Sequence, residues 1–226
     1  MSDRKPILLS WSSGKDSAWA LHVLRQAGTW NVVGLLTTFN ESANRVAMHA
    51  VRRELVEAQA DAAGLPLWPI ELPWPCSNLV YEERLKGAIE RAQQQGIAGI
   101  AFGDLFLEEI REYRIKMLAG TGLEPIFPIW GTPADTPPLA RQMLAGGLQA
   151  ILTCVDPKQL DRKFVGRDFD AELLRDLPAS VDPCGERGEF HTFCHAGTMF
   201  QRPLAVRVGE KVDRDGFCFA DVMIEK

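Results

Sequence analysis

Short apolar runs alternate, in the first half of the chain, with longer segments whose apolar positions recur at helical spacing. The apolar run at 6–11 leads into a polar hexapeptide. After it, Ala18, Leu21 and Leu24 follow a helical period that stops at Gly28. This order of strand and helix signals occurs three more times. Such repetition is typical of βαβ units with a parallel sheet.

These patterns predict the elements of an α/β fold. Strands are expected over 6–11, 31–39, 65–73 and 97–105, and helices over 17–27, 43–64, 77–96 and 108–122. Right-handed crossovers would place helices on both faces of the sheet. The predicted fold class is therefore α/β, with an open, mainly parallel, doubly wound sheet. His49 falls in the second helix and is expected to be a partly buried helix residue, not a catalyst.

The pattern changes near 125–131, where prolines interrupt an extended segment. Beyond it we expect a helix after Pro138, a strand over 148–156, an irregular stretch over 157–188 and two strands around a turn at 213–216. We place two domains, over 1–128 and 129–226, the second a smaller α+β domain. The apolar alternation of the tail hairpin also makes a homodimer through that hairpin an alternative to a monomer.

Composition and charge narrow the class of protein. The chain has 226 residues, of which 46% are hydrophobic and 24% charged, as in a soluble globular protein. The net charge of −5 argues against broad nucleic-acid binding. The sequence shows no secretory signal and no apolar run long enough for a membrane span. Five scattered cysteines suit a reduced, cytoplasmic protein in which most cysteines are small core residues.

The hexapeptide Ser12–Ser17, at the first strand-to-helix turn, has the features of a phosphate-binding loop. Backbone N–H groups in a tight turn and the positive end of a helix dipole both attract phosphate. Gly14 allows close approach, and Lys15 can supply a positive charge. The Walker loop ends in Gly-Lys-Ser/Thr, but Asp16 follows Lys15 here. Asp16 would repel a phosphate unless it orients the loop or helps to hold Mg²⁺. The alternative is a Ser-rich helix cap without a ligand.

Three polar segments lie at the carboxyl ends of predicted strands and should line one crevice, because ligands bind outside the carboxyl ends of parallel strands. These are the hexapeptide, 37–40 with Thr37, and 102–105 with Asp104. Asp104 could bind Mg²⁺ or substrate, and Arg111, on the next helix, could pair with a phosphate. The alternative for this helix start is a charged first turn whose acids suit the helix dipole.

A second polar cluster lies in the loop predicted over 181–200. Substrate recognition by Glu189, His191 and Thr192 is the favoured interpretation, since such polar density on a loop suggests a site. A metal site is a weaker alternative, because the spacing matches no common zinc pattern. Its ligands would be Cys184, His191, Cys194 and His195. A polar surface loop without a function is the third alternative.

Both clusters resemble known motifs. The hexapeptide is similar to the phosphate loop of the N-type ATP pyrophosphatases, usually Ser-Gly-Gly-x-Asp-Ser, with Ser13 in place of the first Gly. The segments "GEFHTF" and "GTMF" resemble signatures of the diphthine–ammonia ligase family and its bacterial relatives. In the second of these, Thr198 stands where that family usually has Pro. The segments "FGDLFLEEIREYR", "IFPIW" and "GRDFD" resemble the bacterial branch.

The resemblance implies an adenine nucleotide alpha hydrolase-like fold that binds ATP with Mg²⁺. Such an enzyme adenylates a small-molecule or protein carboxylate, releases pyrophosphate and amidates the carboxylate with ammonia. Diphthine itself would not be the substrate of a bacterial enzyme. By analogy, the ATP phosphates would be held by Ser12, Ser13, Gly14, Lys15, Asp16, Ser17 and Thr37. Catalysis would involve Lys15, Asp16, Glu189 and His191. Substrate or amine would be held by Asp104, Glu186, Glu189, His191 and Thr192, and Mg²⁺ by Asp16.

Two other functions stay open at this point. One is an ATP-dependent RNA-modifying enzyme of the same superfamily. The net negative charge of the chain argues against this function. The other is a non-catalytic nucleotide-binding sensor, which would leave the second polar cluster without a role.

Overall fold

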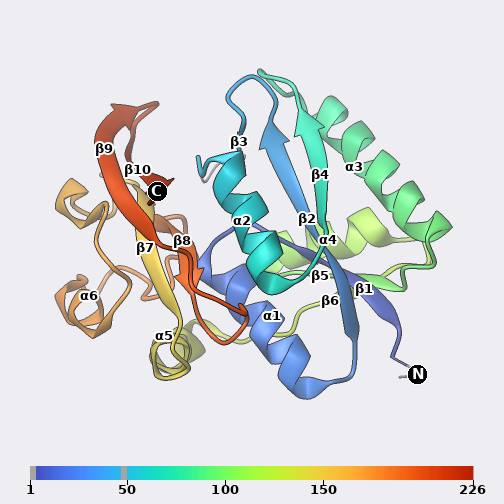
Figure 1. The fold of residues 1–226 in the computed structure, drawn as a ribbon, viewed down its shortest axis with the longest axis horizontal. Coiled ribbons are helices and arrows are strands. Elements are labelled where there is room, and N and C mark those ends of the chain that lie inside the picture. The colour runs from blue at the N-terminus through green and yellow to red at the C-terminus, as the bar shows by residue number, and fades with distance from the viewer. Residues whose placement is uncertain (1–3, 47–49, 226) are drawn as a thin grey trace.

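The computed structural model describes residues 4–46 and 50–225 and contains two sheets (Figure 1). The first sheet has the strand order β3-β2-β1-β5-β6, with β4 paired to the same strand β2. Only β3 runs antiparallel to its neighbour. Its strands are β1 (Pro6–Ser10), β2 (Asn31–Asn40), β3 (Arg45–Val46), β4 (Leu67–Leu72), β5 (Gly99–Ala101) and β6 (Glu124–Ile126).

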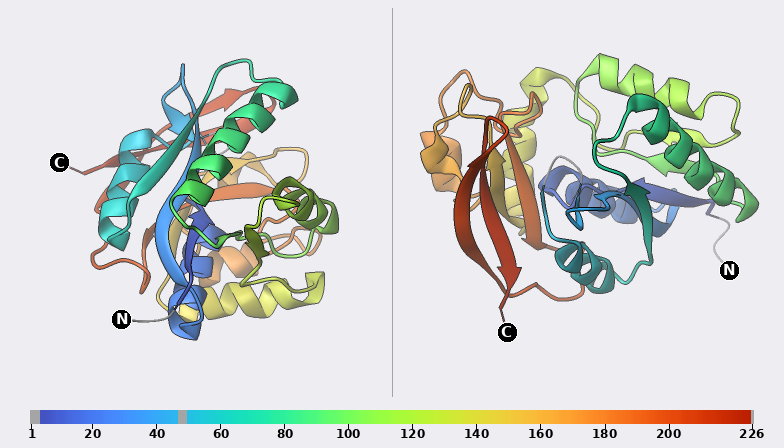
Figure 2. Two further views of the ribbon diagram at one scale, coloured as in Figure 1. Left: turned by 90° about the vertical axis from the view of Figure 1, so that its right-hand side faces the viewer. Right: turned by 90° about the horizontal axis from the view of Figure 1, so that it is seen from above.

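Helices cover both faces of this sheet, which confirms the predicted doubly wound α/β class. They are α1 (Lys15–Ala27), α2 (Arg53–Ala63), α3 (Asn78–Gln94) and α4 (Glu108–Leu118). Ile7 and Leu9 of β1 belong to the core shared with α1 and α2, whereas Leu8 belongs to the core under α3. Period-2 alternation along the strand thus supplies both cores. Figure 2 shows α2 on one side of the sheet and α3 and α4 on the other.

The helix ends follow from local sequence. Gly28 adopts a left-handed φ of 63°, and its N–H donates to the Leu24 carbonyl, which ends α1. The Ser77 hydroxyl accepts a hydrogen bond from the N–H of Val80 and begins α3.

Two predicted elements of this half differ most from the structure in their bounds. The helix predicted from 43 begins at Arg53, because Arg45 and Val46 pair antiparallel with the end of β2. Val46 and Val51 are both buried. These two positions are apolar because they are buried in the core, not because they lie on the apolar face of a helix. The strand predicted over 97–105 is limited to Gly99–Ala101. His49 lies outside the described residues.

The second sheet is antiparallel, in the order β8-β7-β10-β9. Its elements are β7 (Gln149–Val155), β8 (Phe190–Ala196), β9 (Val206–Arg214) and β10 (Phe217–Ile224), with helices α5 (Thr136–Ala145) and α6 (Ala171–Asp176) and 3₁₀ turns at Pro133–Asp135 and Arg162–Phe164. α1 packs against β8, so this strand stands next to the first sheet's helical layer (Figure 1). Phe193 of β8 joins the same core as Leu9. The domain boundary at 128/129 stays a prediction.

The strand β8 corrects the sequence interpretation, which treated 181–200 as one loop. Residues 190–196 pair with β7 and are buried apart from His191 and His195, which are partly exposed. Two histidines in that stretch masked a strand whose remaining side chains are buried.

The structure bears on two expectations from composition, which concern disulfides and membrane spans. None of the five cysteines, all in the described part of the chain, forms a disulfide. Among the described residues, no helix combines the length and the apolar character that a membrane span requires.

Candidate active site

A pocket with a volume of about 410 Å³ opens at the carboxyl ends of β1 and β5, within the range of small-molecule sites. Four segments form it: the hexapeptide, the residues after β5, one face of α4 and the residues around the start of β8. The lining consists of Ser10, Ser12, Gly14, Lys15, Asp16, Ser17, Phe102, Gly103, Asp104, Leu107, Ile110, Arg114, Gly185, Glu186, Gly188, Phe190, His191 and Thr192. The pocket therefore contains Asp104 and the hexapeptide apart from Ser13, but none of residues 37–40, which the sequence also placed at this crevice.

Close backbone contacts bring these segments together. A side chain at Gly103 would lie 3.0 Å from the Ser17 nitrogen, so glycine lets the end of β5 approach the first turn of α1. A Cβ on Gly14 would lie 3.2 Å from the carbonyl oxygen of Thr192. The Lys15 N–H donates to the Thr192 hydroxyl at 3.0 Å. The hexapeptide is thereby packed against β8 over its central residues.

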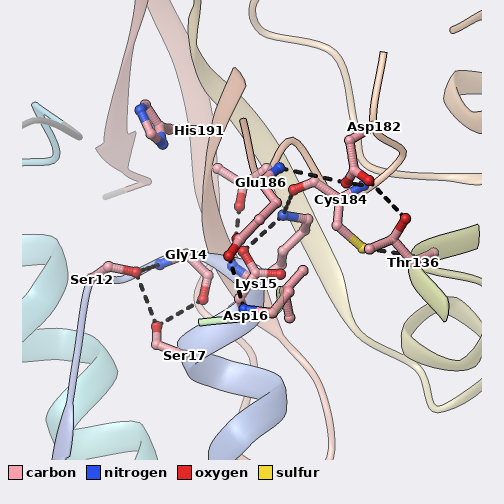
Figure 3. A network of polar contacts seen from close by, with 12 residues as sticks. Ser12, Gly14, Lys15, Asp16, Ser17, Thr136, Asp182, Cys184, Glu186 and His191 are labelled. Atoms are coloured by element: carbon pink, nitrogen blue, oxygen red, sulfur yellow. Dashed lines mark hydrogen bonds and ion pairs between the residues drawn. The ribbon is translucent and has the colours of Figure 1, made fainter. Parts of the chain in front are cut away.

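Hydroxyl groups stabilise the turn from inside. The Ser17 hydroxyl donates to the Gly14 carbonyl at 3.0 Å and lies 3.3 Å from the Ser12 hydroxyl. The Gly14 N–H donates to the same Ser12 hydroxyl at 3.3 Å. Figure 3 shows these three residues on one side of the network. They form a compact turn at the start of α1, as phosphate-binding loops require.

Ser13 differs from the other residues of the hexapeptide. Its φ of 71° is left-handed, a conformation that favours glycine. Its side chain is fully buried, and its hydroxyl oxygen has no hydrogen-bond partner. The position where the similar loops usually have glycine thus keeps a glycine conformation while holding a serine.

Lys15 points into the protein, with 2% of its side chain exposed. Its ammonium lies 2.9 Å from Asp16 Oδ2 and also donates to the carbonyl of Cys184. The rings of Phe169 and Phe190 lie within 6 Å of the ammonium nitrogen. Burial alone would lower the pKa of Lys15, but the negative charge of Asp16 keeps it above its ordinary value. Lys15 is therefore charged and connects the hexapeptide to the loop that precedes β8.

Glu189 organises that preceding loop. Its buried carboxylate accepts hydrogen bonds from the N–H groups of Asp182 and Arg187, both at 2.9 Å. Asp182 in turn accepts from the Cys184 N–H at 2.8 Å and from the Thr136 hydroxyl at 2.7 Å. Glu189 thus holds the loop and does not line the pocket. Figure 3 shows Asp182, Cys184 and Thr136 on the side of the network opposite Ser12 and Ser17.

Glu186 and His191 both line the pocket and have shifted pKa values. Burial, followed by the charge of Asp16, raises the pKa of Glu186 to about 7. Glu186 Oε1 accepts from the Leu105 N–H at 2.8 Å. Burial, followed by the positive charge of Lys15, lowers the pKa of His191 to about 4. The imidazole is therefore neutral near pH 7 and can form a hydrogen bond with an amine.

Arg114 lines the pocket and was missed by the sequence analysis, which pointed to Arg111. Arg114 Nε lies 3.3 Å from Asp104 Oδ2, and its guanidinium is 5.0 Å from the Phe102 ring. Arg111 instead lies over Phe127 and Trp130 and does not belong to the pocket lining. The spacing of Leu107, Ile110 and Arg114 on one face of a helix is the signal that could have identified Arg114.

The donor set suits Mg²⁺ held together with a nucleotide. Asp16 Oδ1 is buried without a hydrogen-bond partner, and Asp16 lines the pocket. Burial raises the pKa of Asp16, while Lys15 opposes the shift. The described residues contain no cluster of three or more His, Cys, Asp or Glu side chains that could hold a metal alone. Mg²⁺ commonly uses one or two carboxylates plus phosphate oxygens, which fits Asp16.

Most of the predicted site residues therefore meet at one pocket. Those in its lining are Ser12, Gly14, Lys15, Asp16, Ser17, Asp104, Glu186, His191 and Thr192. Three others lie behind it. Ser13 and Glu189 are buried, and the Thr37 hydroxyl is also buried and donates to the Trp11 carbonyl at 2.9 Å.

Comparisons with known proteins give matches for both halves of the chain. The family model of the diphthamide synthase N-terminal domain matches residues 5–124, and that of the C-terminal domain matches residues 135–224. A curated relative, diphthine–ammonia ligase from Rattus norvegicus, is 26% identical over 136 residues. That match covers 58% of this chain and 50% of the relative. The chain thus matches about half the length of this curated relative.

Proposed function

The chain belongs to the diphthamide synthase family, and from that premise we propose that it is an ATP-dependent amide ligase. In this proposal the enzyme adenylates a substrate carboxylate, releases pyrophosphate and then transfers the acyl group to ammonia. The supporting observation is the single pocket that joins the hexapeptide to Glu186, His191 and Thr192.

The hexapeptide would act in the first step. The substrate carboxylate attacks the α-phosphorus of ATP, the bond to the β-phosphate oxygen breaks, and pyrophosphate leaves. Backbone dipoles at the start of α1 and the charge of Lys15 stabilise the negative charge that develops. Mg²⁺, held through Asp16, would neutralise charge on the phosphates when bound.

The segment around His191 would act in the second step. Ammonia attacks the acyl carbon, the bond to the AMP oxygen breaks, and the nitrogen loses one proton. His191 is neutral near pH 7 and lines the pocket, so its ring can form a hydrogen bond with the amine, and the released proton passes to solvent. Arg114 lies at the same pocket and can bind the carboxylate that is to be activated.

The acceptor is proposed only as a class. The pocket combines apolar walls from Phe102, Leu107 and Ile110 with polar groups at its hexapeptide end. A carboxylate on a small molecule or on an exposed protein side chain fits this description. The proposed reaction is therefore formation of an amide bond from a carboxylate, and experiment must identify the molecule that carries this carboxylate.

Nucleotide products test the proposal directly. The purified protein is incubated with ATP, Mg²⁺, ammonium and a panel of carboxylates or a cell extract, and the nucleotides are resolved. AMP and pyrophosphate formed in equal amounts, with amide appearing only when ammonium is present, are the expected products. ADP as the product, or unchanged ATP under every condition, would contradict the proposal.

A further inference from the structure

Gln59 is a fully buried polar side chain on α2, behind the hexapeptide and outside the pocket lining. Its amide makes three hydrogen bonds. The Trp11 indole Nε1 donates to Oε1 at 2.8 Å. The Gln59 Nε2 donates to the Ser13 carbonyl at 3.0 Å and to the Cys194 carbonyl at 2.6 Å. A polar side chain with 0% exposure is costly unless it is satisfied in this way.

The partners of Gln59 allow only one orientation of its amide. An indole N–H can only donate, and the two carbonyl oxygens can only accept. Trp11 therefore holds Oε1, and this directs Nε2 toward Ser13 and Cys194. If the amide oxygen and nitrogen were exchanged, the amide N–H groups would face the indole N–H of Trp11. The amide oxygen would then face the carbonyl oxygens of Ser13 and Cys194. Trp11 and Gln59 thus form one hydrogen-bonded unit, in which Trp11 orients the Gln59 amide.

The Trp11–Gln59 pair contacts the hexapeptide at Ser13, the residue with the strained backbone. The Ser13 carbonyl accepts both from Gln59 and from the Cys194 N–H at 2.9 Å. Ser13 has a left-handed φ of 71°, a conformation that costs a non-glycine residue free energy. Such strain persists only where the surroundings fix it. Gln59 and β8 supply two donors to the carbonyl of this residue.

We propose that Gln59 is a positioning residue for ATP, which fixes the backbone of the hexapeptide through Ser13 and is itself oriented by Trp11. This inference rests on the proposed function, since it assumes that the hexapeptide binds the ATP phosphates. Gln59 does not line the pocket, so its effect on ATP is transmitted through the backbone of Ser13 and Gly14. Small displacements of positioning groups have large effects on binding and rate.

The test compares the ATP dissociation constants of two variants with that of the wild type by titration calorimetry with Mg²⁺. Gln59→Met keeps the side-chain volume and removes all three hydrogen bonds. It should weaken ATP binding by about tenfold or more. Trp11→Phe keeps Gln59 and removes only the donor that orients it, so a smaller loss is expected. The double variant should bind ATP no more weakly than Gln59→Met alone, because Trp11 acts on the hexapeptide through Gln59.

A matched control separates positioning from loss of stability. Leu85→Ala opens a cavity in the other core, under α3, and lowers the melting temperature without touching the hexapeptide. All proteins are compared below their melting temperatures. ATP affinities of Gln59→Met and Trp11→Phe equal to that of Leu85→Ala would overturn the positioning role. Should Gln59→Met not fold, Trp11→Phe carries the test alone. Failure of the wild type to bind ATP would instead overturn the proposed function, and this inference with it.

Discussion

The ammonium of Lys15 donates a hydrogen bond to the backbone carbonyl of Cys184, 169 residues further along the chain. The first turn of α1 is thereby fastened to the loop that carries Glu186. The buried lysine thus joins two segments of the pocket and places a positive charge in its lining.

Replacement of Lys15 should therefore reduce turnover sharply. We expect Lys15→Met to lower the rate of AMP formation by about 10²–10³-fold, as for the loss of one preorganised electrostatic group. Its melting temperature should also fall, because Asp16 and the Cys184 carbonyl lose their buried partner. Lys158→Met removes an exposed lysine and serves as the control in the same assay. Full AMP formation by Lys15→Met would exclude the assigned role.

Ser13→Gly should stabilise the protein. Glycine adopts a left-handed φ without the penalty of about 1–2 kcal/mol that other residues incur. The change also removes a buried hydroxyl without a partner. A gain of about 1–2 kcal/mol should raise the melting temperature by roughly 2–4 °C per kcal/mol. Ser13→Ala removes only the hydroxyl and should gain less. A lower melting temperature for Ser13→Gly than for the wild type would contradict this account.

Glu186 should make stability fall as the pH rises between about 4.5 and 7. Its pKa increases from an ordinary 4.5 to about 7 because burial disfavours the charged form. Within that window the folded chain holds a proton that the unfolded chain has released. The free energy of unfolding therefore decreases with pH there. Glu186→Gln should remove this decrease, as measured by urea unfolding at several pH values.

His191 should have the opposite effect over a window that overlaps that of Glu186, so the two contributions oppose each other in the wild type and are separated by the variants. Burial lowers its pKa from 6.5 to about 4, so the unfolded chain binds more protons between these values. Stability from this residue thus rises with pH from about 4 to 6.5. The Glu186→Gln variant should retain the rise, and His191→Gln should retain only the fall caused by Glu186. Identical pH profiles for the two variants would show that neither shift operates.

Arg114 and Arg111 offer a matched pair on one helix. Arg114→Met should lower AMP formation by about 10²-fold, because a guanidinium at the pocket binds carboxylate or phosphate. Arg111→Met should stay close to the wild type, since Arg111 lies over Phe127 and Trp130. Both variants are assayed with the same carboxylate at several concentrations. Equal losses in the two variants would remove Arg114 from the site.

The parts of the site that the sequence predicts best are local. The hexapeptide could be identified because strand, turn and helix signals are contiguous around Gly14. Thr37 shows the limit of this reasoning. It lies in β2 as predicted, but its hydroxyl donates to the Trp11 carbonyl and it does not line the pocket. The direction of a side chain depends on partners that sequence spacing does not reveal.

The errors arise where tertiary contacts override local patterns. Val46 and Val51 are apolar because they are buried, and this mimicked a helical period in a segment that contains β3. His191 and His195 disguised β8 as a loop, although the strand is paired along its length with β7. Gln59 could not be found from the sequence at all, because its partners Trp11, Ser13 and Cys194 lie in two segments far from it along the chain.

The outer edge of β8 has a consequence for how the chain can be divided. This edge strand is hydrogen-bonded at Cys194 to Ser13 and Gln59, both from the first half of the chain. If residues 129–226 were produced alone, the edge would be left open to other strands, and self-association would follow. The two halves are therefore expected to work as complementary fragments: mixed during refolding, each should rescue the solubility of the other.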